Sequence, residues 1–485
     1  MDAAFSATIP LGNQPDRRRG SRANGTERDE GVAVGSSPTR RATFADVFAV
    51  REFRALWVSQ ILSVCGDRLA LVALTLLIYD RTRSPLLAAV AYAAGYVPYV
   101  LGALFLSGLA DRLPRREVMV ACDVIRAVLV AAMLVPRVPL EVLIALLYAT
   151  TAVQPPFDSA RSAVLADVVR GERYALAAAA MQTTFRVGIV AGAAAGGVMV
   201  ALVGTRFALG VDAATFVVSA LVVQFGLRAR AAAGGAAKGS PRAGSGALAQ
   251  LGAGVRVVFG DKALLTLVMF GWLAALYEFP EGIAAPYADR LGGGPVAVGL
   301  LIASAQVGSA LTMPVFVAKV GPLTRLRWMG PMAFCACAVL TLTLLRPGLA
   351  VSMAIFAVSG AFATYQIAAN TAFVARVPNE RRAQAFGLAN AGLIVGQGVA
   401  FLVAGAAVEV VPPSTVVALG GGLGAIAAVG LALRWRHMSP AVGRHSARHL
   451  GAGPRQARYH VPRQARDHTA NRRVPVHAIR SRARD

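Results

Sequence analysis

Charge is scarce in this sequence of 485 residues, where charged side chains make up 15% of the chain. A typical soluble domain carries about 25%. Hydrophobic residues make up 56%, and the few charges are gathered between long apolar runs. This segregation excludes a large soluble core and predicts an all-α membrane protein.

Lysine is nearly absent, since the chain has only Lys238, Lys262 and Lys319. A P-loop requires a Gly-Lys pair followed by Ser or Thr, and none of the three lysines follows a glycine. This absence excludes a P-loop ATP motor within the chain.

Cysteine is scarce as well, and Cys65, Cys122, Cys335 and Cys337 all lie in apolar segments. Cys335 and Cys337 are two residues apart, so on a helix they point away from each other. The sequence shows no disulfide framework, tetrahedral metal site, nucleophile motif or pair of catalytic carboxylates in a pocket. We therefore expect no metal, no cofactor and no enzymatic activity.

Apolar runs long enough to cross a bilayer recur about twelve times, given that a span needs about 20 residues rising about 1.5 Å each. Six precede a linker at 228–261, which is rich in Ala, Gly, Ser and Arg, and six follow it. The expected spans are 55–79, 86–109, 118–136, 140–158, 175–201, 205–227, 262–280, 296–318, 329–346, 349–372, 384–408 and 413–434. They predict twelve transmembrane helices in two six-helix bundles, 51–227 and 262–436, with disordered tails at 1–50 and 437–485.

The net charge of +24 comes largely from the tails, with nine Arg in residues 1–54 and thirteen in residues 434–485. A basic balance often indicates nucleic-acid binding. No soluble domain with a recognition motif accompanies it here, so we expect no nucleic-acid partner. The C-terminal tail cannot build a core, and anionic lipid headgroups are its expected contact.

Lys and Arg in the connections predict the orientation in the membrane. They concentrate in the 2–3, 4–5, 8–9 and 10–11 connections, the linker and both tails, whereas the opposite connections carry few. By the positive-inside rule, both termini are expected to be cytoplasmic. The expected location is the cell membrane (plasma or inner), crossed several times by a protein without a signal peptide.

The stretch SGLADRLPRR at 107–116 places several charges in one turn between spans 2 and 3. It resembles the signature loop G-x-L-a-D-r-x-G-r-R of the major facilitator superfamily, although Ser107 and Pro114 replace its two glycines. The matching residues are Leu109, Ala110, Asp111, Arg112, Arg115 and Arg116. Together with the two predicted halves and the linker, the resemblance covers about residues 50–436.

This resemblance implies a secondary transporter in which the loop is a conformational latch. Asp111, Arg112, Arg115 and Arg116 form this expected gating loop. A carboxylate at Asp111 can accept hydrogen bonds from free N–H groups at helix N-termini when the cytoplasmic side closes. The alternative is that the loop only sets the topology.

A second resemblance concerns GIVAGAAAGG at 188–197 in span 5. In the superfamily, G-x-x-x-G-P-x-x-G-G in this span marks exporters and antiporters. Gly188, Gly192, Gly196 and Gly197 match that spacing, and Ala193 replaces the proline. Glycines four apart also allow ordinary close helix packing, which is the alternative interpretation.

Ionisable residues within spans are candidates for coupling or substrate binding because their burial in lipid is costly. Asp67 lies in the middle of span 1 and Arg186 at similar depth in span 5. The resemblance implies that both spans line the cavity, so we expect the two side chains to face one another. They would then form either a proton-coupling site or a static ion pair.

The second half offers further polar candidates. Glu278 and Glu281 lie near the expected outer end of span 7, where they either attract cations or are solvated loop residues. Gln306 and Gln397 are uncharged polar residues in apolar spans, where they either bind substrate or hydrogen-bond neighbouring helices.

The expected cavity is mostly apolar, which favours a hydrophobic or amphipathic small-molecule substrate. The stretches FDSARSAVLADVV at 157–169 and GVDAATF at 210–216 resemble drug, macrolide or siderophore efflux members of the superfamily. The sequence therefore predicts a monomeric exporter in the lipid bilayer with the proton as coupling ion. The alternatives are an importer of the same fold and a non-transporting receptor or scaffold.

Overall fold

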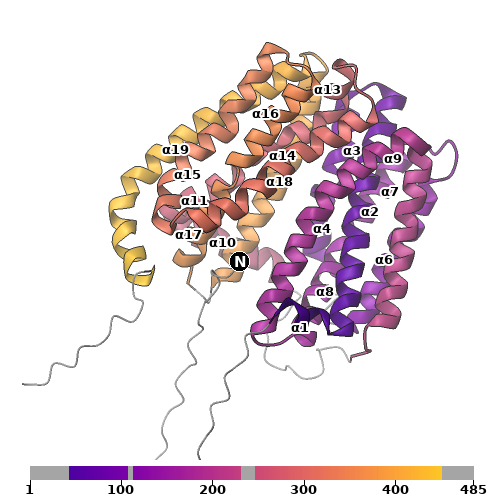
Figure 1. Cartoon of the computed structure of the whole chain (residues 1–485), viewed down its shortest axis with the longest axis horizontal. Coiled ribbons are helices and arrows are strands. Elements are labelled where there is room, and N and C mark those ends of the chain that lie inside the picture. The colour runs from indigo at the N-terminus through magenta and orange to yellow at the C-terminus, as the bar shows by residue number, and fades with distance from the viewer. Residues whose placement is uncertain (1–42, 107–112, 231–245, 379–380, 451–485) are drawn as a thin grey trace, which may run out of the picture. The chain divides into compact units, whose positions relative to one another are not determined.

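The computed structural model describes residues 43–106, 113–230, 246–378 and 381–450, and all its regular elements in these ranges are helices (Figure 1). Before residue 230 they are α1 (Phe44–Phe48), α2 (Arg51–Thr82), α3 (Pro85–Ala93), α4 (Val97–Phe105), α6 (Arg115–Met133), α7 (Leu140–Ala152), α8 (Gln154–Val168) and α9 (Glu172–Gly226). We refer to α2–α9 as the N-terminal group. The helix α10 (Gly246–Gly260) follows within the segment expected to be a linker.

The remaining helices form the C-terminal group, taken up to Arg436 because residues His437–Asp485 form a separate unit. They are α11 (Lys262–Trp272), α12 (Ala275–Glu278), η2 (Phe279–Ile283), α13 (Ala284–Arg290), α14 (Pro295–Lys319), α15 (Pro322–Ala338), η3 (Val339–Leu345), α16 (Leu349–Phe362), α17 (Tyr365–Arg376), α18 (Arg382–Val408) and α19 (Pro413–Leu450). Both groups lie within one compact unit that ends at Arg436.

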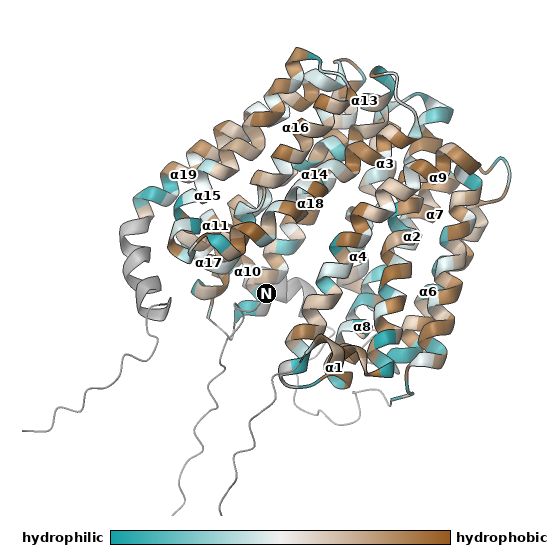
Figure 2. Cartoon of the chain, in the orientation of Figure 1, coloured by the Kyte–Doolittle hydropathy of each residue, from teal (hydrophilic) through white to brown (hydrophobic). Residues whose placement is uncertain are grey.

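Ten helical segments among the described residues are long and apolar enough to cross a membrane. One of them, Arg173–Gly226, has 54 residues. At about 1.5 Å per residue it exceeds twice the roughly 30 Å of a bilayer core. Its Gly204, with φ 83° and ψ 164°, is not helical, so α9 is two helices joined there. Hydrophobic residues run along most of the helices (Figure 2).

Several predicted boundaries were wrong. Span 7 was expected to end at residue 280, but the apolar segment continues to Arg290 because Pro280 lies within the 3₁₀ turn Phe279–Ile283, which leads on into α13. Span 4 likewise extends to Val168, since its two prolines occupy the first turn of α8, where a missing N–H costs little. The short helix α1 lies within the range expected to be a disordered tail, and α19 continues past residue 436.

The helices have two ends that we name for orientation. The basic end holds the start of α2 at Arg51, the start of α6 at Arg115 and the end of α14 at Lys319. The far end holds the end of α2 at Thr82 and the start of α14 at Pro295. At the basic end, the Asp261 side chain caps α11 by accepting from Ala263 N (2.8 Å) and pairs with Arg376. Burial alone would raise the pKa of Asp261, but the hydrogen bonds from Arg376 and the α11 backbone hold it below its usual value.

Packing within the C-terminal group depends on two glycines that bring α14 and α16 together. A Cβ at Gly308 would overlap the carbonyl oxygen of Ala357, and one at Gly360 would overlap that of Ala305. The two backbones are therefore in direct contact at this crossing, as small residues allow in membrane helices.

Replacing Gly360 with Ala is expected to lower the free energy of unfolding by about 1–3 kcal/mol, because the backbone of α14 must move away. The matched control is Gly271→Ala on α11, where an added Cβ meets open space. It is expected to change stability by less than about 1 kcal/mol. Thermal unfolding in detergent measures the stability of both variants. Equal melting temperatures of Gly360→Ala and Gly271→Ala would contradict the close crossing of α14 and α16.

Candidate functional site

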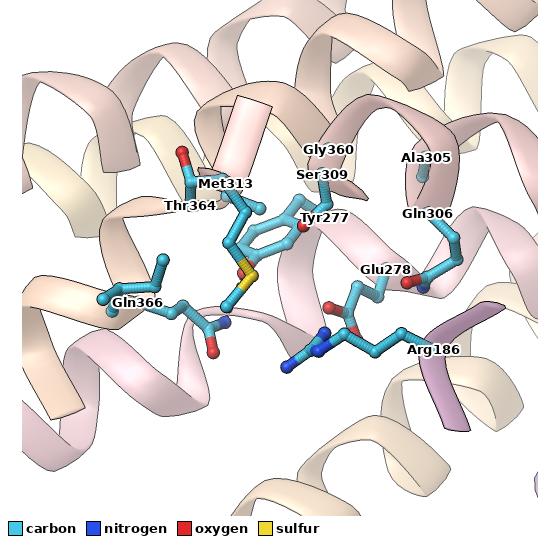
Figure 3. A pocket seen from close by; sticks show the side chains of 12 residues that line it. Arg186, Tyr277, Glu278, Ala305, Gln306, Ser309, Met313, Gly360, Thr364 and Gln366 are labelled. Atoms are coloured by element: carbon cyan, nitrogen blue, oxygen red, sulfur yellow. Dashed lines mark hydrogen bonds between the residues drawn. The ribbon is translucent and has the colours of Figure 1, made fainter. Parts of the chain in front are cut away.

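A cavity lined by both polar and apolar side chains lies where the two groups of helices face each other (Figure 3). It contains about 550 Å³ of space, part of which is open to solvent. Arg186 of α9 lines one wall, and Glu278 of α12, Gln306 of α14 and Gln366 of α17 line the other. Gln306 and Met313 occupy the middle and the basic half of α14, so the cavity is displaced toward the basic end.

The break in span 7 places two carboxylates beside this cavity. The chain passes from α12 into the 3₁₀ turn η2, which contains Pro280, between Glu278 and Glu281. Glu278 accepts a hydrogen bond from Gln397 of α18, and Glu281 accepts one from Gln306 (3.0 Å). Glu281 is only 8% exposed, so the expectation of a solvated loop at the outer end of span 7 was wrong for this residue.

Glu281 also joins the two groups of helices. The hydroxyl of Tyr92 on α3 donates to its Oε2 at 2.8 Å. The ring of Tyr92 packs edge-on against the ring of Phe401 of α18, with 5.1 Å between the ring centroids. The guanidinium of Arg68 on α2 interacts electrostatically with Glu281 and with the hydroxyls of Tyr92 and Tyr96. A carboxylate of the C-terminal group is therefore held by side chains of the N-terminal group.

Asp67 does not face Arg186, contrary to the expectation. It forms an ion pair with Arg126 of α6, inside the N-terminal group. Neighbouring residues on a helix diverge by about 100°, so Arg68 turns toward the cavity side while Asp67 turns into its own bundle. Arg186 instead lies opposite Glu278, with which it interacts electrostatically across the cavity (Figure 3).

The Arg126 side chain is the centre of a buried polar cluster. It is 1% exposed, donates to Ser63 Oγ at 3.3 Å and lies 4.1 Å from the ring centroid of Phe216. The carboxylates of Asp123 and Asp212, 0% and 1% exposed, interact with it electrostatically. Arg126 therefore compensates the acids that the sequence places in spans 1, 3 and 6.

Arg126→Met is expected to lower the free energy of unfolding by about 3–5 kcal/mol, because it leaves buried carboxylates without a cation. The double variant Arg126→Met/Asp67→Asn should lose less than Arg126→Met alone. Arg206→Met, at an exposed position of α9, is the control and should stay within about 0.5 kcal/mol. Thermal unfolding in detergent measures all three, and a double variant less stable than Arg126→Met would contradict the pairing.

The expected gating loop is only partly visible, since Asp111 and Arg112 lie outside the described residues. Arg115 forms an ion pair with Asp167 at the end of α8, and it donates to the carbonyl of Ala163. Arg116 donates to the carbonyl of Leu227 at 3.5 Å. Both arginines thus fasten the start of α6 to other helices of the N-terminal group.

The glycines of 188–197 face two different partners. A Cβ at Gly188, Gly192 or Gly196 would meet α2 at Val64, Cys65 or Leu69. A Cβ at Gly197 would instead lie 2.5 Å from Pro295 O and 3.1 Å from Gly299 Cα. Both of these residues are at the start of α14, in the C-terminal group. The stripe therefore holds α9 on α2, and its last glycine holds α9 on α14.

Polar contacts also join the groups at the far end. Tyr79 donates to Asp289 at 3.1 Å, and Arg83 lies 3.8 Å from the same carboxylate. Glu409 accepts from Ser84 Oγ at 2.5 Å and from Leu86 N at 3.1 Å. These contacts join the two groups at the far end, while the cavity lies nearer the basic end.

Sequence reasoning missed Tyr92 and Tyr96 as part of the site, and it placed Arg68 in the middle of span 1 without a partner. The two tyrosines are one helical turn apart in span 2, which is the only signal the sequence offers for them. It could not show that they meet Glu281, which lies 189 residues further along the chain.

The architecture is that of a multi-pass membrane protein: apolar helices in two groups around a cavity lined by polar and apolar side chains. The chain belongs to the Major Facilitator Superfamily, whose model matches residues 56–364 and 282–475. It is 28% identical over 184 residues to an uncharacterized MFS-type transporter, YkuC, of Bacillus subtilis. That match covers 37% of this chain and 42% of the relative, which is less than half of the relative's length.

Solved structures share the fold at low identity. A POT family transporter in complex with a thioalcohol-conjugated peptide matches with a TM-score of 0.64 and 10% identity, over 81% of this chain and 96% of the other. The nucleoside transporter NupG matches with a TM-score of 0.59 and 17% identity, over 79% and 99%. A bacterial homologue of the iron transporter ferroportin, in an inward-facing state, matches with a TM-score of 0.56 and 14% identity. This match covers 79% of this chain and 98% of the other. The solved structures, at 10% to 17% identity, show the fold alone, whereas the family is one of transporters, which points to a transporter rather than an enzyme.

Proposed function

We propose that the protein is a twelve-span, proton-coupled exporter of an amphipathic small molecule, working as a monomer by alternating access. It lies in the cell membrane with both termini in the cytoplasm. The basic end is then the cytoplasmic end, in line with the positive-inside rule. The cavity between the two groups of helices is the transport site.

The count of twelve rests on two helices beyond the ten candidates. The break at Gly204 divides α9 into two spans. The helix α6 has 19 residues and is the third span, although it carries five charged side chains. Two of these, Asp123 and Arg126, are buried within the N-terminal group and need not meet lipid.

The observation that carries proton coupling is the hydrogen bond between Tyr92 and Glu281. It joins the two groups of helices through a buried carboxylate. A hydrogen bond to an ionised carboxylate is roughly twice as strong as one to a neutral group. Protonation of Glu281 would therefore weaken this contact and favour separation of the groups on the far side. Glu278, three residues before it in span 7, is a second proton acceptor and lines the cavity itself.

The closed far end and the cavity near the basic end support an inward-facing state. In this state a substrate from the cytoplasm would reach Arg186, Glu278 and Gln306. Opening of the far end then requires the contacts of Asp289 and Glu409 to break. The proposed cycle alternates between this state and one in which the far end is open.

Export is favoured over import by the glycine stripe of α9, which has the spacing of the exporter motif and packs against α2. The test uses inverted vesicles from cells that express the protein. Substrate is expected to enter the vesicle lumen when the lumen is acid, whereas an importer would require the opposite gradient. The substrate for this assay is identified by a susceptibility panel, which tests the toxic compounds against which the protein protects a pump-deficient host.

The remaining alternative, a non-transporting receptor or scaffold, places the activity in the C-terminal tail. Deletion of residues 451–485 separates the two hypotheses. Full transport in the truncated protein supports the exporter. The opposite result is a cellular phenotype that the truncated protein loses and the Glu281→Gln variant keeps. That result would indicate that the C-terminal tail carries the function.

A further inference from the structure

The charges around the cavity are divided by origin. Both arginines, Arg68 and Arg186, come from the N-terminal group, and both acids, Glu278 and Glu281, come from the C-terminal group. When both carboxyl groups are ionised the two pairs balance, and the cavity then has a positive wall and a negative wall. A ligand that adds a net charge would be repelled by one of the walls.

Arg186 and Glu278 are the members of this set that line the cavity itself. Their side chains point into the same space from opposite walls (Figure 3). They interact electrostatically but do not form an ion pair within 4.0 Å. Among the described residues, no side chain forms a hydrogen bond with the Arg186 guanidinium.

Glu278 keeps one neutral partner, Gln397, whereas Glu281 is already occupied by Tyr92 and Gln306. The cavity thus offers one guanidinium donor on one wall and one carboxylate acceptor on the other. Arg186 is exposed and Glu278 is half-buried, so a ligand in the cavity can reach both side chains. A ligand that inserts between the two with an opposite charge facing each of them makes two charge-assisted contacts.

The rest of the lining is mixed. Ser309 and Thr364 offer hydroxyls, and Gln366 donates to the hydroxyl of Tyr277. Met313 and Ile367 are the apolar groups toward the basic end. This lining suits a small molecule that has an apolar substituent besides its polar groups.

We propose that the substrate is zwitterionic, with a carboxylate bound to Arg186 and an ammonium group bound to Glu278. This inference rests on the proposed function and narrows its substrate class. An apolar substituent of the zwitterion lies against Met313 and Ile367. Such a molecule adds no net charge to the cavity, which sets it apart from a lipophilic cation.

The experiment measures binding to the purified full chain with three probes that share a benzyl group. Phenylalanine is the zwitterion, phenylalanine amide the cation and N-acetylphenylalanine the anion. Alanyl-phenylalanine and its amide and N-acetyl derivatives form a larger set. Wild type is expected to bind the zwitterion of at least one set roughly tenfold to a hundredfold more tightly than either derivative, as the loss of one charge-assisted contact implies.

Two variants test which residue binds the carboxylate of the probe and which binds its ammonium group. Arg186→Gln should remove the preference for the zwitterion over the amide, and Glu278→Gln the preference for the zwitterion over the N-acetyl derivative. Arg186→Lys should keep the first preference because it keeps the charge. Arg206→Gln on α9 and Glu141→Gln on α7, at exposed positions, are the controls and should keep both.

Three results would overturn the inference. Wild type could prefer a cation, an anion or an uncharged compound. It could bind no zwitterion of either set. Both variants could weaken all probes equally, which would make Arg186 and Glu278 a contact between the groups rather than a binding pair. Acid-driven uptake into inverted vesicles, measured with compounds from the susceptibility panel, decides separately whether the proposed function stands.

Discussion

Replacing Glu281 with Gln is expected to reduce transport driven by a pH gradient by roughly tenfold or more, while substrate exchange at equal pH persists. The glutamine amide cannot take up or release a proton, so the gradient no longer acts on this position. Its carbonyl oxygen can still accept the hydrogen bond of Tyr92, as a neutral carboxyl group would. The variant therefore imitates the protonated state.

The measurement uses proteoliposomes, with an imposed pH difference in one arm and labelled substrate exchange in the other. Glu141→Gln on α7 is the control, because this carboxylate is exposed and remote from the cavity. Tyr92→Phe should have a smaller effect, since it removes the contact but leaves a group that titrates. If Glu281→Gln retained full gradient-driven transport, Glu281 would not be the coupling group.

Adding one methyl group at Gly197 is expected to lower transport by roughly tenfold or more. The new Cβ would lie 2.5 Å from Pro295 O, so the backbones of α9 and α14 could not remain as close as they are. The strain of about 1–3 kcal/mol falls on the state in which the far end is closed. A penalty of this size changes the ratio of two states by about tenfold to a hundredfold.

Gly197→Ala should therefore favour opening of the far end. Hydrogen exchange of the backbone amides in residues 82–92 and 286–296 is expected to become faster. Gly210→Ala lies in α9 beyond the break at Gly204, where an added Cβ meets open space, and should leave transport within about twofold of wild type. Unchanged exchange and transport in Gly197→Ala would show that this contact does not control the far end.

The apolar runs of the sequence predicted most of the helices because hydrophobicity along a span is a local property. The spans expected at 296–318 and 349–372 correspond to the apolar segments Pro295–Lys319 and Leu349–Arg376. The errors occurred at prolines: the sequence does not show whether Pro280 ends a helix or only changes its hydrogen bonding. The structure continues through it to Arg290.

Within the site, the sequence identified the charged and polar residues but not their partners. Arg186, Glu278 and Gln306 do line one cavity, and Gln397 holds Glu278. Asp67 was expected to face Arg186 but pairs with Arg126. Successive positions on a helix point about 100° apart, so the depth of Asp67 in its span does not show which helix it faces. The predicted role of each residue in coupling or binding remains to be measured by the experiments above.

The sequence by itself determined the membrane character, the family and the positions of the rare charges, since each depends on residues close together in the chain. Only the tertiary structure decided that Glu281 meets Tyr92 and that Gly197 meets Gly299. Such contacts depend on how far each helix is rotated about its own axis and on where span 7 breaks. Those quantities are set by packing between distant segments, which a linear pattern of apolar residues does not specify.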